Sequence, residues 1–262
     1  MKYYITLLIL LITLPSYAQM VQGGVTENGE WYTTTGSKHQ IIDSQTNAPV
    51  SNAKITLPKQ NYTTYTDSKG SFDLNTKVND SSVLSVEKQG YRPFSVTVNE
   101  KLASHPIVIG IEKSNVNDVI LSTEMIHLGD DSFSSASANS GEFKGSASGA
   151  FYSKLFVLPQ NARTKKNYLV IGSIIGIDTL MARNMKQNSI ANSFSSPPEV
   201  WFNGRKIAEI QLNGDGQRVR LPNELVRVGT NEITIRTGRN MQRTDYIDYD
   251  DIEFMNLSVL TE

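Results

Sequence analysis

Short apolar–polar runs separated by turn residues constrain this chain more than any other feature of its sequence. Residues 53–57 and 94–98 alternate apolar and polar side chains with the two-residue period of a half-buried strand. Residues 200–202 and Ile207 flank Asn203-Gly204, and this dipeptide supplies the positive φ angles of a type I′ hairpin turn. Charged residues make up only 19% of the chain, which suits strands joined by polar turns. We therefore predict an all-β fold.

The chain of 262 residues is long enough for two modest domains, each with its own core. One set of short strands occupies residues 38–113, residues 114–118 form a polar linker, and a second set occupies residues 119–262. We expect a β-sandwich from each set. Within the last run, apolar residues stand at 252 and 254 and then at 255, 257 and 259. This change of parity predicts a bulge, or a strand covered on both faces.

The N-terminus has the three parts of a signal peptide. Lys2 gives a positive start, residues 5–14 form a short apolar run, and Ser16-Tyr17-Ala18 offers small residues for cleavage. A membrane-spanning helix needs about 20 apolar residues, so we expect removal of residues 1–18 rather than a retained anchor, and no stable membrane span. Residues 19–37 would then be a polar leader, or an added edge strand.

The chain contains no cysteine. This excludes the lipid anchor of bacterial lipoproteins, which needs a cysteine after the cleavage site, and it excludes disulfides. Export without disulfides indicates a bacterial protein that is secreted, periplasmic or at the cell surface. The net charge of −1 offers no basic stripe, so we expect no nucleic-acid partner.

Residues 38–113 carry a set of motifs that together resemble one known domain. In chain order they are Ile42-Asp43, Ala48-Pro49-Val50, Ala53-x-Ile55, Thr66-Asp67-x-x-Gly70-x-Phe72 and Gly90-Tyr91. The set resembles the carboxypeptidase regulatory-like domain, a transthyretin-like sandwich. His39 departs from the family pattern, which has a Gly-containing opening strand. The resemblance implies an accessory module without the catalytic machinery of those enzymes.

Three motifs of the second half resemble the galactose-binding-like sandwich, a jelly-roll fold found in carbohydrate-binding modules. They are Val200-x-Phe202-Asn203-Gly204-x-x-Ile207, Val228-Gly229-Thr230-Asn231-x-Ile233-x-Ile235 and Tyr249-Asp250-Asp251-Ile252-Glu253-Phe254. The resemblance spans residues 119–262 and implies the larger of the two sandwiches. Members differ in the loops that bind ligand, so it does not identify a ligand.

Catalytic motifs are missing from the sequence. The three histidines, His39, His105 and His127, are scattered and show no zinc-protease spacing. There is no cysteine nucleophile, no G-x-S-x-G elbow and no phosphate-binding glycine loop. A pair of carboxylates brought together only by the fold leaves a glycoside-active enzyme open. We expect a protein that is not an enzyme.

Two acidic pairs lie near the two ends of the second domain. Asp130-Asp131 stands near its start and Asp250-Asp251 near its end. In the superfamily that this domain resembles, the first and last strands are often neighbours and a structural Ca²⁺ is common. Ca²⁺ takes about six to eight oxygen ligands, so these four carboxylates are candidate ligands for it. The alternative is an ordinary turn and an acidic loop that repels edge-to-edge association.

Sugar recognition would depend on aromatic side chains with polar neighbours. Trp201 has the opposite parity to Val200 and Phe202, so it faces away from them. A second polar and aromatic group lies near the C-terminus, and the candidate ligand-binding residues are Trp201, Tyr246, Tyr249, Arg243 and Asn240. For Trp201 the alternative is packing on the second face of the sandwich.

The expected function is that of a secreted binding or adhesion protein that binds carbohydrate through its C-terminal sandwich. A structural component of an envelope or matrix, with no small ligand, is the alternative. A glycoside-active enzyme is the third. Exposed aromatics beside polar groups favour the first, an uncovered edge strand favours the second, and convergent buried carboxylates in a cleft favour the third.

Overall fold

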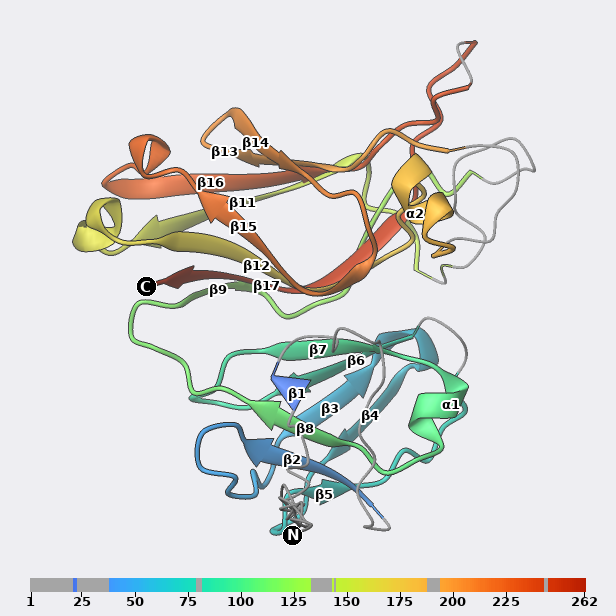
Figure 1. The fold of residues 1–262 in the computed structure, drawn as a ribbon, viewed down its shortest axis with the longest axis vertical. Helices are drawn as coiled ribbons and strands as arrows, with labels where there is room; N and C mark the ends of the chain where they lie inside the picture. The colour runs from blue at the N-terminus through green and yellow to red at the C-terminus, as the bar shows by residue number, and fades with distance from the viewer. Residues whose placement is uncertain are drawn as a thin grey trace, which may run out of the picture.

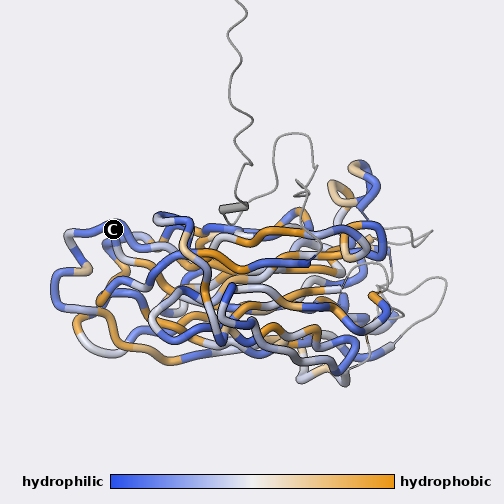
Figure 2. The backbone as a smooth tube through the Cα atoms, turned by 90° about the horizontal axis from the view of Figure 1, so that it is seen from below, coloured by the Kyte–Doolittle hydropathy of each residue, from blue (hydrophilic) through white to orange (hydrophobic). Residues whose placement is uncertain are grey.

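The computed structural model describes residues 21–22, 38–78, 82–132, 143, 145–187, 194–242 and 245–262. Over these residues the protein is all-β, as the sequence predicts, with four sheets stacked in layers (Figure 1). Hydrophobic positions run along the strands and hydrophilic loops gather at their ends (Figure 2). The predicted signal peptide, residues 1–18, and all of the predicted leader except Val21–Gln22 lie outside the described residues.

Two four-stranded sheets form the first domain, in the orders β1-β8-β2-β5 and β4-β3-β6-β7. Strand β8 pairs in parallel with both β1 and β2, so β1 is an added edge strand. Buried side chains such as Ile55, Leu84 and Ile109 fill the space between the sheets. The elements are β1 (Val21–Gln22), β2 (His39–Asp43), β3 (Lys54–Leu57), η1 (Pro58–Gln60), β4 (Tyr62–Tyr65), β5 (Ser71–Phe72), β6 (Ser82–Glu87), β7 (Phe94–Val98), α1 (Glu100–Ala103) and β8 (Val108–Ile111).

The second domain is a larger antiparallel sandwich. One sheet has the order β10-β17-β12-β15, with β9 also paired to β17, and the other has the order β11-β16-β13-β14. None of the helices in the described part of the chain is long and apolar enough to cross a membrane. The elements are β9 (Val119–Ser122), β10 (Ile126–Leu128), β11 (Phe151–Leu158), η2 (Gln160–Thr164), β12 (Asn167–Ile175), α2 (Leu180–Asn184), β13 (Glu199–Phe202), β14 (Arg205–Glu209), β15 (Gly214–Leu221), η3 (Asn223–Leu225), β16 (Gly229–Arg236) and β17 (Ile252–Thr261).

The predicted Asn-Gly hairpin joins β13 to β14. These strands pair antiparallel around a two-residue loop, Asn203 and Gly204, whose φ angles are 50° and 82°. Two successive positive φ angles are the mark of a type I′ turn, and its twist matches that of the flanking strands. The hairpin prediction is therefore confirmed.

The Thr-Asp-x-x-Gly motif of the first domain has a direct structural reason. The Thr66 hydroxyl donates to the Val50 carbonyl (2.7 Å) and accepts from the Ala53 N–H (2.8 Å), which ties two segments together inside the domain. Gly70 has a φ of +71°, and a Cβ atom there would lie 2.5 Å from the Ile41 carbonyl oxygen. Only glycine satisfies both the backbone angle and the close approach.

The two domains are packed face to face. The sheet β4-β3-β6-β7 lies against the sheet that contains β12, β15 and β17 (Figure 1). At this interface the Asp215 carboxylate accepts from the Thr97 N–H (3.0 Å), the Thr97 hydroxyl (2.9 Å) and the Ser173 hydroxyl (2.6 Å). The Asn256 amide donates to the Ser85 hydroxyl at 2.9 Å. Several buried polar groups are thus paired across the junction, whereas the Ser95 hydroxyl and Asn256 Oδ1 have no hydrogen-bond partner among the described residues.

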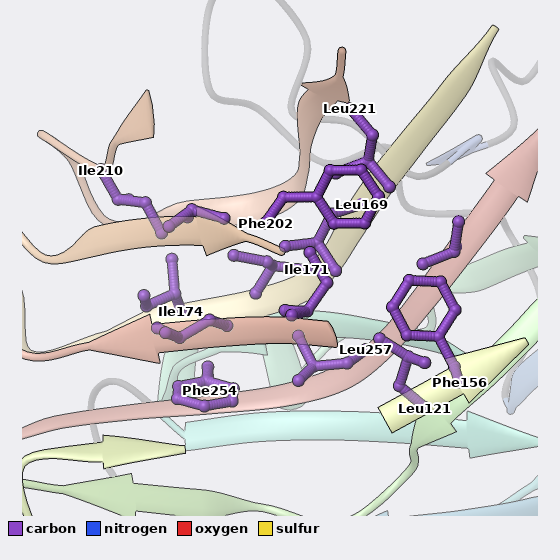
Figure 3. Close-up of a cluster of buried hydrophobic side chains, with 14 of the residues drawn as sticks. Leu121, Phe156, Leu169, Ile171, Ile174, Phe202, Ile210, Leu221, Phe254 and Leu257 are labelled. Atoms are coloured by element: carbon purple, nitrogen blue, oxygen red, sulfur yellow. The ribbon is translucent and has the colours of Figure 1, made fainter. Parts of the chain in front are cut away.

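Strand β17 is buried along its whole length, and all ten of its residues have low exposure. Phe254 and Leu257 belong to the core of the second domain (Figure 3), whereas Met255 packs on Val83 of the first domain. Between them Asn256 has a φ of 60°, and the pairing with β9 shifts register just beyond it. Both predicted causes of the parity change, an irregularity and cover on both faces, are therefore present.

Replacement of Gly172 should test how closely the two domains fit together, when it is compared with replacement of a strand glycine that has more space around it. A Cβ atom at Gly172 would lie 2.5 Å from the Ser95 hydroxyl and 2.7 Å from the Asn256 Cβ. We expect Gly172→Ala to lower the free energy of unfolding by about 1–3 kcal/mol, the usual cost of overpacking. Gly214→Ala is the control, because its Cβ would lie 3.5 Å from the nearest side chain, that of Gln217. Equal urea midpoints for the two variants would contradict the close fit.

Asp43 should make the first domain sensitive to acid. Its Oδ1 accepts from the N–H groups of Gln45 and Thr46, and the Tyr91 hydroxyl donates to its Oδ2. The Thr46 backbone hydrogen bond is the main cause that lowers the pKa of Asp43 to about 2. The stabilisation is therefore complete above the unfolded-state pKa of about 4 and is lost as the pH falls towards 2. We expect Asp43→Asn to be less stable than the native protein at pH 7, with a gap that narrows between pH 4 and pH 2 in urea unfolding. A gap independent of pH would contradict this role.

Candidate functional site

The two acidic pairs predicted from the sequence lie together at one end of the second domain. Strand β10 pairs antiparallel with the start of β17, which brings the segment after β10 beside the segment before β17. The Tyr249 N–H donates to Asp130 Oδ2 and the Asp131 N–H donates to Asp251 Oδ1, each at 3.1 Å. Asp250 lies between those two contact points along the chain.

The four carboxylates nevertheless point in different directions. Asp251 faces His127, whereas Asp250 Oδ2 accepts from the Ser195 hydroxyl at 2.7 Å on the other side. The Asp130 Oδ1 accepts the N–H of Ser132 at 3.0 Å. Carboxylates with separate partners do not gather the six to eight oxygens that Ca²⁺ takes. The calcium hypothesis stays a prediction, and only the Asp131 and Asp251 part of it has a shared location.

His127 is the residue of this site that sequence reasoning missed as a ligand. Its Nδ1 is hydrogen-bonded to the Gly145 carbonyl, and its Nε2 lies 2.9 Å from Asp251 Oδ1. The Phe143 ring packs on the imidazole with 4.8 Å between centroids. The sequence did offer one indication that His127 lies near the acidic pairs. Only Leu128 separates it from the Gly129-Asp130-Asp131 turn, and it stands four residues before Asp131.

Burial and hydrogen bonding act against each other at this pair. Burial lowers the pKa of His127, but hydrogen bonds to Asp251 and to the Gly145 carbonyl raise it above its ordinary value. Burial also raises the pKa of Asp251, against the opposing effect of His127. A glycine makes the contact possible, since a Cβ at Gly129 would lie 2.3 Å from the Asp251 Cγ. The site is thus a buried imidazole–carboxylate pair held by a tight turn.

A cavity of about 450 Å³ opens beside His127, at the junction of the two domains. The first domain contributes Pro58 and Lys59 to its lining, and the second contributes Glu124, Tyr152 and Glu253 among others. Burial raises the pKa of Glu253. The cavity gives the His127 region access to solvent in an otherwise packed part of the molecule.

A second polar network lies behind Asp250. Asp178 is fully buried, and Arg183 of α2 binds its carboxylate with two hydrogen bonds of 2.8 and 2.7 Å. Thr179 caps α2, because its hydroxyl accepts the Ala182 N–H. Burial raises the pKa of Asp178, although Arg183 opposes the rise. This arrangement anchors the helix to the end of the sandwich and leaves no exposed carboxylate for chemistry.

The predicted sugar-binding residues fall into two places. Trp201 is half-buried on β13, opposite Thr234 on β16, while Tyr249 bridges to Arg239. Thr234 lies within β16, whereas Arg239 lies beyond the end of this strand at Arg236, so Trp201 and Tyr249 pair at different positions along the chain.

The remaining candidates lie with Tyr249. Tyr246 is exposed in the same loop, but Asn240 is buried and its amide donates to Asp248 Oδ2. Arg243 lies outside the described residues.

The solvent-facing side of the sheet β11-β16-β13-β14, here called the outer face, carries the predicted Trp201 and also Phe151, which the sequence analysis did not single out. Phe151 is 60% exposed on β11 and lies opposite Arg236 on β16. The guanidinium of Arg236 stacks over the Trp201 ring at 4.3 Å, and the Trp201 Nε1–H donates to Glu199 at 2.8 Å. Two aromatic rings therefore flank one guanidinium on an uncovered sheet.

Comparison with known proteins bears on the first domain. Residues 38–121, about a third of the chain, match the family described as CarboxypepD_reg-like domain. The match begins at residue 38, where the predicted first domain begins, and ends at residue 121, eight residues beyond its predicted end at 113. No curated protein matches the chain. The first domain is therefore similar to a domain family known by its fold, and the second must be interpreted from its own geometry.

Removal of Arg183 should expose the cost of the buried Asp178 charge. Arg183→Met leaves that carboxylate without its partner, and we expect a loss of about 3–5 kcal/mol in the free energy of unfolding at pH 7. Burial already raises the folded-state pKa of Asp178, and without Arg183 it rises further, so the folded variant takes up a proton here at a pH above the unfolded-state pKa and the loss should shrink as the pH is lowered from 7 to 4.5. Lys206→Met, which removes two exposed ion pairs with Glu199 and Glu209, should cost far less, because solvent screens charges at the surface. Urea unfolding at pH 7 and pH 4.5 provides the measurement, and similar losses for both variants would contradict the expectation.

Proposed function

We propose that this is an exported, non-enzymatic binding protein that recognises carbohydrate through the outer face of its second domain. The observation that carries the proposal is the group formed by Phe151, Arg236 and Trp201 on a sheet face that no other sheet covers among the residues that the structure describes. Sugar rings stack their C–H faces on aromatic side chains, and a flat platform suits a polysaccharide chain better than a small free ligand.

Polar groups on the same face are placed to accept and donate to sugar hydroxyls. The Ser153 hydroxyl lies 2.5 Å from the Thr234 hydroxyl and 2.8 Å from Glu232 Oε1. Ser153 and Thr234 form a cross-strand pair of β11 and β16, two residues along these strands from the pair formed by Phe151 and Arg236. Apolar rings with a few polar groups between them are typical of a carbohydrate-binding face.

The electrostatics of this face favour binding over hydrolysis. The Lys206 hydrogen bond lowers the pKa of Glu199, and the Trp201 indole adds to the effect. A glycosidase needs one carboxyl group with a raised pKa to protonate the leaving group. Glu199 has the opposite shift, so we assign it to ligand contact and not to catalysis.

The rest of the chain is consistent with a presenting role. The first domain would be a spacer, rigidly docked through the Asp215 and Asn256 hydrogen bonds. The resemblance of residues 119–262 to galactose-binding-like sandwiches supports recognition by the second domain. The signal-like residues 1–18 support export from a bacterial cell.

A second candidate function, assembly into an envelope or matrix, is favoured by strand β11. This eight-residue strand lies at the edge of its sheet and pairs with β16 alone. Leu155 and Val157 on it are more than 60% exposed. An exposed apolar edge strand is a template for pairing with another chain.

Affinity electrophoresis in gels that contain soluble polysaccharides tests the carbohydrate proposal. We expect at least one polysaccharide to retard the native protein, and Phe151→Ala and Trp201→Ala to weaken binding about tenfold each, or about 1.4 kcal/mol. Tyr65→Ala is the matched control, since Tyr65 is a similarly exposed aromatic residue (56%) that belongs to the first domain and not to the outer face of the second.

Retardation that survives both substitutions would exclude the outer face as the binding site. A native protein that no polysaccharide retards, and that forms oligomers dispersed by Val157→Lys, would instead support the assembly alternative.

A further inference from the structure

We propose that His127, Asp131 and Asp251 form a binding site for a divalent transition-metal ion of the Zn²⁺ class. Each residue offers one ligand atom, and these atoms lie within 4.8 Å of one another. They come from three places: β10, the turn that follows it, and the segment that leads into β17. A bound ion would join these segments.

The strongest support is an oxygen atom without a partner. Asp251 is fully buried, and its Oδ2 has no hydrogen-bond partner among the described residues. An unpaired buried acceptor costs about 1–3 kcal/mol, and more when it is charged, so such atoms are rare in native proteins. Coordination to a cation would satisfy this oxygen.

The orientation of His127 is that of a metal ligand. Its Nδ1–H donates to the Gly145 carbonyl, and its Nε2 lies 2.9 Å from Asp251 Oδ1. Metal-bound histidines almost always donate their second ring N–H to a carbonyl or carboxylate in this way. The contact between Nε2 and Oδ1 needs a positive charge between the two atoms, which either a proton on Nε2 or a metal ion in its place supplies.

The ligand set selects the kind of ion. One imidazole and two carboxylates, with water in a fourth position, match the tetrahedral N and O coordination of Zn²⁺. Ca²⁺ requires about six to eight oxygens, which these residues do not supply. Ligand bonds of about 2.0–2.2 Å require the three atoms to draw closer. Asp131 allows this movement, because its side chain is 47% exposed.

Solvent can reach the site from one side. The cavity at the domain junction is lined by His127 and also by Lys59 and Glu253. It offers a path for the ion and space for a bound water. The opposite side is closed by the Phe143 ring and by the close approach of Gly129 to Asp251.

Calorimetric titration of the full chain, first freed of metal with chelator, tests the site. We expect Zn²⁺ to bind with one-to-one stoichiometry and to raise the thermal unfolding midpoint, and Ca²⁺ to do neither. His127→Gln and Asp131→Asn should each weaken Zn²⁺ binding at least a hundredfold. Asp131 is exposed enough for its variant to fold even if changes at buried positions prevent folding.

Two controls separate this site from background binding. Asp130→Asn should leave Zn²⁺ affinity unchanged, since Asp130 is not one of the three residues whose ligand atoms lie within 4.8 Å of one another. His105→Gln, at an exposed histidine in the first domain, reports adventitious zinc binding. Absence of Zn²⁺ binding by the native chain, tighter binding of Ca²⁺ than of Zn²⁺, or full affinity in Asp131→Asn would overturn the proposal.

Discussion

Strand β17 packs against apolar layers on both of its faces, and the rest of the molecule is arranged around it. Phe254 and Leu257 face the core of the second domain, while Met255 faces the first domain. Burial of a large apolar side chain is worth about 1.5–3 kcal/mol, so a strand that buries side chains on both faces contributes to two hydrophobic contacts at once. The two domains therefore share one central element, and the usual freedom of domains joined by a short linker is removed.

The double burial of β17 also explains where polar groups are tolerated. A sheet covered on both sides must pair its polar side chains internally, and Asp215, Ser173 and Thr97 do so at the junction. The strand begins just after the Asp250-Asp251 segment, where β10 adds the imidazole of His127. The candidate metal site therefore precedes the start of β17, whereas the junction hydrogen bonds lie a few residues further along it, where Met255 pairs with Ser173.

The outer face is one of the two sheet faces at the ends of the four-layer stack, and the other belongs to the sheet β1-β8-β2-β5 (Figure 1). The sheets that contain β6 and β17 cover each other, whereas the sheet with β11 and β13 faces solvent. Its aromatic rings therefore remain available, and its edge strand β11 remains unpaired on one side. Such a face is consistent with two functions. An extended ligand would contact the rings of Phe151 and Trp201, whereas another protein chain would pair with the edge strand β11.

Local sequence determined the all-β class, the Asn203-Gly204 hairpin, the motif turn at Gly70 and the irregularity in β17, because each follows from side-chain period or from a backbone angle that few residues adopt. It also placed two acidic pairs near the ends of one domain. Only the tertiary structure decided that His127 contacts Asp251 and that Asp250 contacts Ser195 instead. Neighbouring residues of an extended chain point to opposite sides, so Asp250 and Asp251 meet different partners. These partners are distant in sequence, since His127 is 124 residues from Asp251 and Ser195 is 55 residues from Asp250. The exposure of Phe151 was equally beyond the sequence, since alternation reveals that a strand has two faces but not which of them a second layer will cover.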